Sequence, residues 1–253
     1  MMSAPESMPS RASGRRRIYL MRHGSVSYFT PEGKPIAPET VPLNARGIEQ
    51  AQAAGNLFAA HDVRFDRVIT SGLPRTLETA QHVLAAINHV GTVEQRPCLQ
   101  EIRGGRLATI PEKDLLQCFT ALTDGVVDED VQFLGGETVR EMLDRVLPEI
   151  DRLRADAAWD SLLLVLHGAV NRAILSYLVT GQRILLGAFE QSPACINVLD
   201  IGEAKIDVVV RMVNLSPLDW LQPGNRRTTM ETLFDQYAKY RRTLKIQGEQ
   251  ANV

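Results

Sequence analysis

The chain has 253 residues, of which 44% are hydrophobic and 23% are charged, enough for a globular protein with a sizeable core. The formal net charge of -2 favours neither nucleic acid nor an anionic membrane as a partner, so a local cluster of cations must hold any anionic ligand. Three cysteines without metal-site spacing, Cys98, Cys118 and Cys195, indicate reduced thiols in a cytoplasmic protein.

The N-terminal segment, residues 1–16, is rich in Ser and Pro and runs into consecutive arginines. We predict a disordered tail, and we interpret the arginines as a solvated flank rather than a nucleic-acid arm. The apolar stretch that follows stops at Arg22, too short for a signal peptide or a membrane span. Because no long linker interrupts the rest, we predict a single domain over residues 17–245.

The first half of the chain alternates apolar runs with amphipathic stretches. The predicted strands are Arg17–Met21, Phe65–Thr70 and Thr92–Gln95. A long loop, residues 25–43, follows the first strand and leads to a helix that Asn44 caps. A second helix begins at Pro74 and runs to about Ala86.

The stretch Gly104–Gly136 lacks this alternation, and we predict an insertion over the core with a helix at Glu112–Leu122. Leu162–Leu166 is an uninterrupted aliphatic run, typical of a central strand buried on both faces. The other predicted elements are helices at Glu137–Leu153, Ala169–Val179 and Met230–Leu244 and a hairpin of Ala194–Ile201 with Lys205–Val213 that turns at Gly202-Glu203. Alternating strands and helices predict an α/β sandwich, and the hairpin predicts a mixed sheet.

Two histidines stand where a predicted strand gives way to a loop, and each precedes a glycine: His23-Gly24 and His167-Gly168. If their strands are parallel neighbours, both rings emerge at the carboxyl edge, where open α/β sheets bind ligands. A histidine there can attack phosphorus and carry the phosphoryl group. The pair therefore indicates a phosphoryl-transfer site.

Three charged residues join this candidate site. Arg22 adjoins His23, and Arg75 lies in the first turn of a helix, where its fork and the helix N-terminus can meet phosphate oxygens. Glu101, in the loop after the third strand, is a candidate acid for the leaving oxygen. Arg75 alone would be interpreted as a solvated helix residue, and Glu101 alone fits an ordinary loop glutamate as well as a site residue, so the prediction depends on the whole set.

These motifs, in this order, resemble the histidine phosphatase superfamily, in the branch of the cofactor-dependent phosphoglycerate mutases and broad-specificity phosphatases. The motifs that carry the resemblance are Arg22-His23-Gly24, Asn44 within Leu43–Gly47, Ser71–Ala80, Leu99–Ile102, Gly135–Thr138 and His167-Gly168. The resemblance runs from about Ile18 to Trp220. It implies a three-layer α/β/α sandwich with a mixed, mostly parallel sheet and an inserted cap at about residues 104–136.

The resemblance also implies roles for the site residues. His23 would be the phosphorylated nucleophile, and Glu101 would protonate the leaving group and then activate water. The phosphoryl group would be held by Arg22, Arg75, His167 and Gly168. No metal and no cofactor are implied.

The sequence thus predicts a metal-independent phosphomonoesterase that acts through phosphohistidine on a small phosphorylated metabolite. A phosphoglycerate-type mutase would use the same residues, but the segment Ile102–Arg106 lacks the mutase pattern. A protein phosphatase, or a binding protein that keeps the phosphate pocket, is a further alternative. Arg103 and Arg106 are either contacts for a second anionic group or solvated charges. The oligomeric state is left open, with a homodimer among the alternatives.

Overall fold

The computed structural model of the protein describes residues 14–123, 125–219, 224 and 226–250. Most of the predicted tail, residues 1–16, lies outside the described residues. Arg16, the last residue of that predicted tail, instead begins the first strand, where it pairs with Ile201 of a neighbouring strand. Among the described residues, no helix is both long and apolar enough to cross a membrane.

A six-stranded sheet with the order β3-β2-β5-β1-β7-β8 forms the centre of the fold. Its strands are β1 (Arg16–Arg22), β2 (Arg67–Thr70), β3 (Val93–Gln95), β5 (Ser161–Leu166), β7 (Ile196–Ile201) and β8 (Val208–Leu215). The pairs β1–β5, β5–β2 and β2–β3 are parallel, whereas β7 is antiparallel to both β1 and β8. The prediction of a mixed, mostly parallel sheet is therefore confirmed. The turn of the terminal hairpin is longer than predicted, since it spans residues 202–207.

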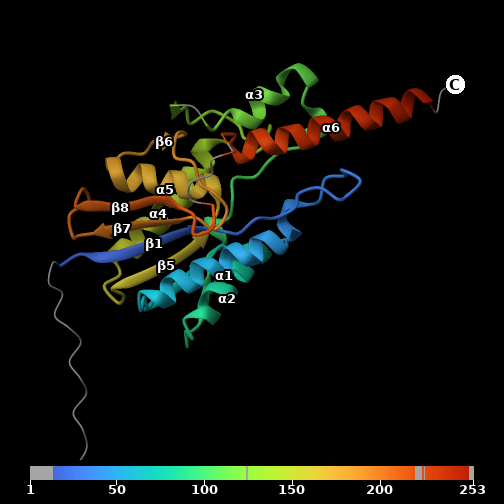
Figure 1. Ribbon diagram of the computed structural model, residues 1–253. Coiled ribbons are helices and arrows are strands. Elements are labelled where there is room, and N and C mark those ends of the chain that lie inside the picture. Colours follow the sequence, from blue (N-terminus) through green and yellow to red (C-terminus); the bar gives the residue numbers. More distant parts are fainter. Residues whose placement is uncertain (1–13, 124, 220–223, 225, 251–253) are drawn as a thin grey trace, which may run out of the picture.

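Helices cover both faces of this sheet, which confirms the three-layer α/β/α sandwich (Figure 1). On one face lie α1 (Ala45–Ala60) and α2 (Pro74–Ala86), and on the other lie α4 (Val139–Ala155) and α5 (Gly168–Thr180). The central position of β5 explains why its residues 162–166 are all apolar. Leu162 and Leu164 pack toward α4 and α5, whereas Leu163 packs toward α1 and α2, because successive side chains of a strand point to opposite faces.

The predicted insertion lies between β3 and α4. The helix η2 (Pro97–Leu99) precedes it, and the insertion itself contains the short helices η3 (Leu107–Thr109), η4 (Glu112–Asp114) and α3 (Leu115–Thr120) and the strand β4 (Val126–Val127). The single helix predicted at Glu112–Leu122 is thus a turn of 3-10 helix followed by a shorter α-helix. Strand β4 pairs with β6 (Leu185–Leu186) in a separate two-stranded sheet.

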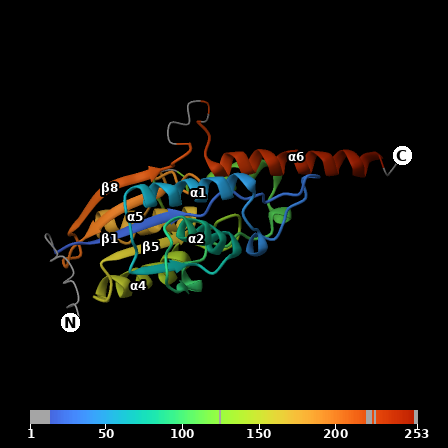
Figure 2. The same ribbon diagram turned by 60° about the horizontal axis from the view of Figure 1, so that its bottom comes forward.

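The C-terminal helix α6 (Thr229–Gln250) lies beside α3 of the insertion rather than in one of the two layers that cover the sheet (Figures 1 and 2). It projects past the end of the sheet in both views. A third apolar cluster joins the two elements, and its buried members are Ile110, Leu115, Phe119, Leu134 and Tyr237. The insertion and α6 thus share a core of their own, whereas Leu122 and Val127 of the insertion join the main core.

Candidate active site

The two predicted histidines lie side by side at the carboxyl edge of the sheet. Arg22 of β1 is in register with Leu166 of β5, so His23 and His167 follow at the same level. Their ring centroids are 5.3 Å apart, with an angle of 62° between the ring planes. Both side chains are buried. The parallel pairing of β1 with β5 therefore brings the two histidine rings together.

His23 is held as a neutral ring with one free nitrogen. Its Nδ1 lies 2.7 Å from the backbone oxygen of Gly24, and because a carbonyl only accepts, Nδ1 carries the proton. Burial, followed by the charges of Arg75 and Arg22, lowers the pKa of His23 well below its usual value. The Nε2 atom is therefore unprotonated at neutral pH, which is the state of a nucleophile.

His167 is held by the hydroxyl of Ser71, whose Oγ lies 2.8 Å from Nε2. Its other nitrogen, Nδ1, is buried without a hydrogen-bond partner among the described residues. Burial, together with the nearby charges of Arg75 and Arg22, lowers the pKa of His167 well below its usual value. When Ser71 donates its hydrogen bond, Nδ1 carries the ring proton and can donate it to an anion.

The two predicted arginines are buried beside these rings, and each has one terminal nitrogen tied to the protein. NH1 of Arg22 donates to the hydroxyl of Thr229 at 3.0 Å and to the carbonyl of Gln191, whereas NH1 of Arg75 donates to the carbonyl of Pro38 at 2.6 Å. In both side chains Nε is buried without a partner among the described residues. Such unsatisfied donors are costly, so they indicate a place for a ligand with acceptor atoms.

Glu101 and Gly168 complete the set. The Glu101 carboxylate accepts a hydrogen bond from the backbone N–H of Ala169 at 3.2 Å, at the positive N-terminus of α5. A Cβ atom on Gly168 would lie 3.6 Å from Oε2 of Glu101 and 3.7 Å from Nε of Arg22. The carboxylate and the guanidinium therefore approach each other across Gly168. Glu101 and Gly168 therefore lie in the same site as the two histidines and the two arginines.

A close approach of two backbones shapes the loop after His23. A Cβ on Gly24 would lie only 2.5 Å from the carbonyl oxygen of Gly47 in α1, so only glycine fits there. The N–H of Gly24 donates to Oγ1 of Thr79 at 3.0 Å, which ties the loop to α2. These contacts fix the carbonyl of Gly24, and through it the ring of His23.

Sequence reasoning missed several supporting residues. Ser71 follows β2 directly, so the strand-end signal that identified the histidines also applied to it. Thr79 lies one helical turn beyond Arg75, whereas Thr229 carries no local signal for its contact with Arg22. Arg103 and Arg106 are exposed, and neither lines the pocket above His23.

A cavity of about 250 Å³ opens above His23. Its lining comes from the end of β1, the loop after it, the segment before β7 and the start of α6. These residues are Arg22, His23, Gly24, Ser25, Val26, Tyr28, Glu190, Ser192, Pro193, Arg227, Thr229, Thr232, Leu233 and Gln236. Within the described ranges, no group of three or more His, Cys, Asp or Glu side chains is placed to hold a metal ion.

Comparisons with known proteins find similar sequences and folds. The adenosylcobalamin/alpha-ribazole phosphatase of Escherichia coli (strain K12) is 30% identical over 190 residues, which cover 74% of this chain and 91% of that protein. A 6-phosphofructo-2-kinase/fructose-2,6-bisphosphatase of Caenorhabditis elegans is 29% identical over 164 residues, 64% of this chain but only 34% of that protein. The crystal structure of the alpha-ribazole phosphatase from Shigella flexneri is 26% identical, with a TM-score of 0.62 over 79% of this chain and 96% of that one.

Residues 18–214 match the family model of the histidine phosphatase superfamily (branch 1), which is most of the chain. The matched range contains both strand-end histidines, both buried arginines and Glu101. The chain therefore belongs to branch 1 of the histidine phosphatase superfamily and is an enzyme of that superfamily.

Proposed function

We propose that the protein is a metal-independent phosphomonoesterase that hydrolyses a small phosphorylated substrate through a phosphohistidine at His23. The observation that carries the proposal is a set of buried donors that have no partner within the described part of the chain, namely Nε of Arg22, Nε of Arg75 and Nδ1 of His167, beside the unprotonated Nε2 of His23. A tetrahedral phosphoryl group offers the acceptor oxygens that these donors lack.

In the first step, Nε2 of His23 attacks phosphorus, and the bond from phosphorus to the ester oxygen breaks. Glu101 acts in this step in its protonated form and gives its proton to that oxygen, so the substrate leaves as an alcohol. Arg22, Arg75 and His167 hold the three remaining phosphoryl oxygens and offset the charge that develops on them. Arginine side chains thus supply the positive field that a metal ion would otherwise supply.

In the second step, water attacks the phosphorus of phosphorylated His23. Glu101, now a carboxylate, takes a proton from this water, and the bond from phosphorus to nitrogen breaks. Inorganic phosphate leaves and the neutral ring is restored. The low pKa of His23 favours this cycle, because it keeps the free ring unprotonated and ready for the next substrate.

The test is turnover of p-nitrophenyl phosphate in the presence of a chelator. We expect steady release of product by the wild type and a loss of kcat by about three orders of magnitude or more in His23→Ala. His61→Ala is the matched control, since His61 is an exposed residue at the end of α1.

A second readout follows the intermediate itself. Wild-type protein quenched during turnover of a ³²P-labelled ester should carry an acid-labile, base-stable label, as expected of phosphohistidine, and His23→Ala should carry none. Wild-type turnover in His23→Ala would overturn the proposal. So would a wild type that hydrolyses no ester but isomerises 3-phosphoglycerate, which is the outcome expected of a mutase.

A further inference from the structure

Helix α6 lies beyond the range 18–214 that matches the family, and yet it forms one wall of the cavity above His23. Its first two turns contribute Thr229, Thr232, Leu233 and Gln236, and Arg227 directly precedes them. This wall therefore comes from a part of the chain that lies outside the matched range.

The first residue of α6 reaches the phosphate-binding machinery directly. Oγ1 of Thr229 accepts a hydrogen bond from NH1 of Arg22 at 3.0 Å, between residues 207 positions apart in the sequence. The carbonyl of Gln191 accepts from the same nitrogen. These two acceptors fix the rotation of the guanidinium, so that Nε, which has no partner among the described residues, lies near Gly168 and Glu101.

The N-terminus of α6 is itself held in place. The backbone N–H of Thr228 donates to Oε2 of Glu231 at 2.6 Å, and the N–H of Glu231 donates to Oγ1 of Thr228 at 3.2 Å. This reciprocal pair is a capping box, which fixes where the helix begins. The position of Thr229, and hence its contact with Arg22, follows from this cap.

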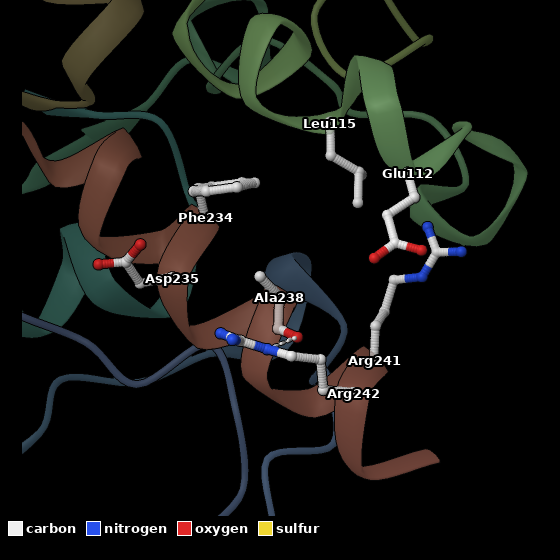
Figure 3. A pocket seen from close by; sticks show the side chains of 7 residues that line it. All are labelled: Glu112, Leu115, Phe234, Asp235, Ala238, Arg241 and Arg242. Carbon is white, nitrogen blue, oxygen red and sulfur yellow. Dashed lines mark hydrogen bonds between the residues drawn. The ribbon is translucent and has the colours of Figure 1, made fainter. Parts of the chain in front are cut away.

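The opposite side of α6 rests on the insertion. The ring of Phe119 in α3 lies 5.9 Å from that of Phe234 and 6.1 Å from that of Tyr237. A second cavity, of about 330 Å³, lies between this side of α6 and the insertion, lined among others by Leu115, Phe234 and Ala238 (Figure 3). Phe234 and Ala238, which are one helical turn apart, line this second cavity, whereas Leu233 and Gln236 line the cavity above His23. Helix α6 therefore separates the two cavities.

We infer that the first two turns of α6 determine which leaving groups the enzyme accepts, an inference that rests on the proposed phosphatase activity. Thr229 is a positioning residue that acts through Arg22. Thr232, Leu233 and Gln236 form the wall that the leaving group contacts when its phosphate sits at His23.

The chemistry of the cavity indicates the class of leaving group. The lining combines hydroxyl and amide groups from Ser192, Thr232 and Gln236 with apolar side chains of Val26 and Leu233. Besides Arg22, which is assigned to the phosphate, two charged side chains line the cavity. The Glu190 carboxylate would repel a second phosphate, and the Arg227 guanidinium already forms an ion pair with Asp235. The matching substrates are monophosphate esters of uncharged alcohols that carry further hydroxyl or amide groups and an apolar face.

The positioning role is tested with Thr229→Val and Thr229→Ser. We expect Thr229→Val to lower kcat/KM by about 10-fold for every ester, because a hydrogen bond to a charged group that binds phosphate is lost, and Thr229→Ser to restore it. Binding of inorganic phosphate, measured by calorimetry, should weaken and recover in the same order. This second readout requires no turnover, and unchanged phosphate affinity in Thr229→Val would overturn the positioning role.

The wall is tested with Gln236→Ala and, as the matched control one turn further along an exposed face, Lys239→Ala. Gln236→Ala should lower kcat/KM for fructose 6-phosphate several-fold more than for p-nitrophenyl phosphate, whereas Lys239→Ala should leave the ratio unchanged. The wild type should prefer fructose 6-phosphate to fructose 1,6-bisphosphate. A preference for the bisphosphate, or an unchanged ratio in Gln236→Ala, would overturn the inference while hydrolysis that depends on His23 would stand.

Discussion

At the scale of single residues, two neutral histidines share a site with two permanently charged guanidiniums. Burial lowers the pKa of both His23 and His167, and the charges of Arg75 and Arg22 lower it further. Between the unfolded pKa of about 6.5 and the lower folded values, the unfolded chain binds more protons at these rings than the folded protein does. Their contribution to stability is therefore complete above about pH 6.5 and is lost as the pH falls below it.

This linkage predicts a measurable slope. Between pH 6.5 and 5, the free energy of unfolding should fall by up to about 1.4 kcal/mol per pH unit for each of the two rings. Urea denaturation at a series of pH values measures it. His167→Gln should reduce the slope, whereas His61→Gln, at an exposed position, should keep it. A wild-type stability that stays flat over this range would contradict the lowered pKa values.

At the scale of elements, helix α4 shows how a local signal sets a boundary. Oγ1 of Thr138 accepts from the N–H of Glu141 at 3.1 Å, and the Glu141 carboxylate accepts from the N–H of Thr138 at 2.8 Å. The predicted helix Glu137–Leu153 therefore begins at Val139 instead. Its apolar stripe, which includes Met142 and Val146, then packs on the sheet.

Removal of this cap has a defined cost. Thr138→Ala should lower the free energy of unfolding by about 1 kcal/mol, because the N–H of Glu141 loses its acceptor. Thr138→Ser keeps an acceptor oxygen and should lose only a fraction of that amount. The measurement is chemical denaturation of both variants beside the wild type. Equal stabilities of Thr138→Ala and Thr138→Ser would show that the capping box does not stabilise α4.

At the scale of the whole molecule, the buried apolar residues that the structure describes form three clusters instead of one. Two of them lie on the two faces of the sheet, and the third joins the insertion to α6. The third is the smallest, and it depends on aromatic contacts such as those of Phe119 with Phe234 and Tyr237. A small separate cluster opens at lower free energy than the main core, so the insertion and α6 should open as a unit.

Hydrogen exchange tests this division. Phe119→Ala should lower the free energy of local opening by about 3 kcal/mol, and so speed amide exchange in α3 and α6 while the amides of β1 and β5 keep their protection. Leu164→Ala, in the central strand, should instead lower protection throughout the domain. If Phe119→Ala lowers protection equally in the sheet, the insertion and α6 are part of one cooperative unit with it.

The features that the sequence determined by itself are those with a local signature. The aliphatic run of β5 predicts burial on both faces, Asn44 predicts the start of α1, and the strand ends predict that His23 and His167 meet. Each depends on the periodicity or capping chemistry of neighbouring residues, or on the rule that parallel strands end at one edge.

Only the tertiary structure decided what surrounds that edge. The hydroxyl of Ser71 meets His167, and the hydroxyl of Thr229 meets Arg22, in contacts between residues 96 and 207 positions apart. The insertion also packs on α6, and no sequence pattern within either segment predicts this contact. Local periodicity reports which face of an element is apolar, but the partner of that face is fixed by the packing of the whole chain. The reaction type is thus predicted by local motifs, whereas the wall that faces the leaving group is set by packing.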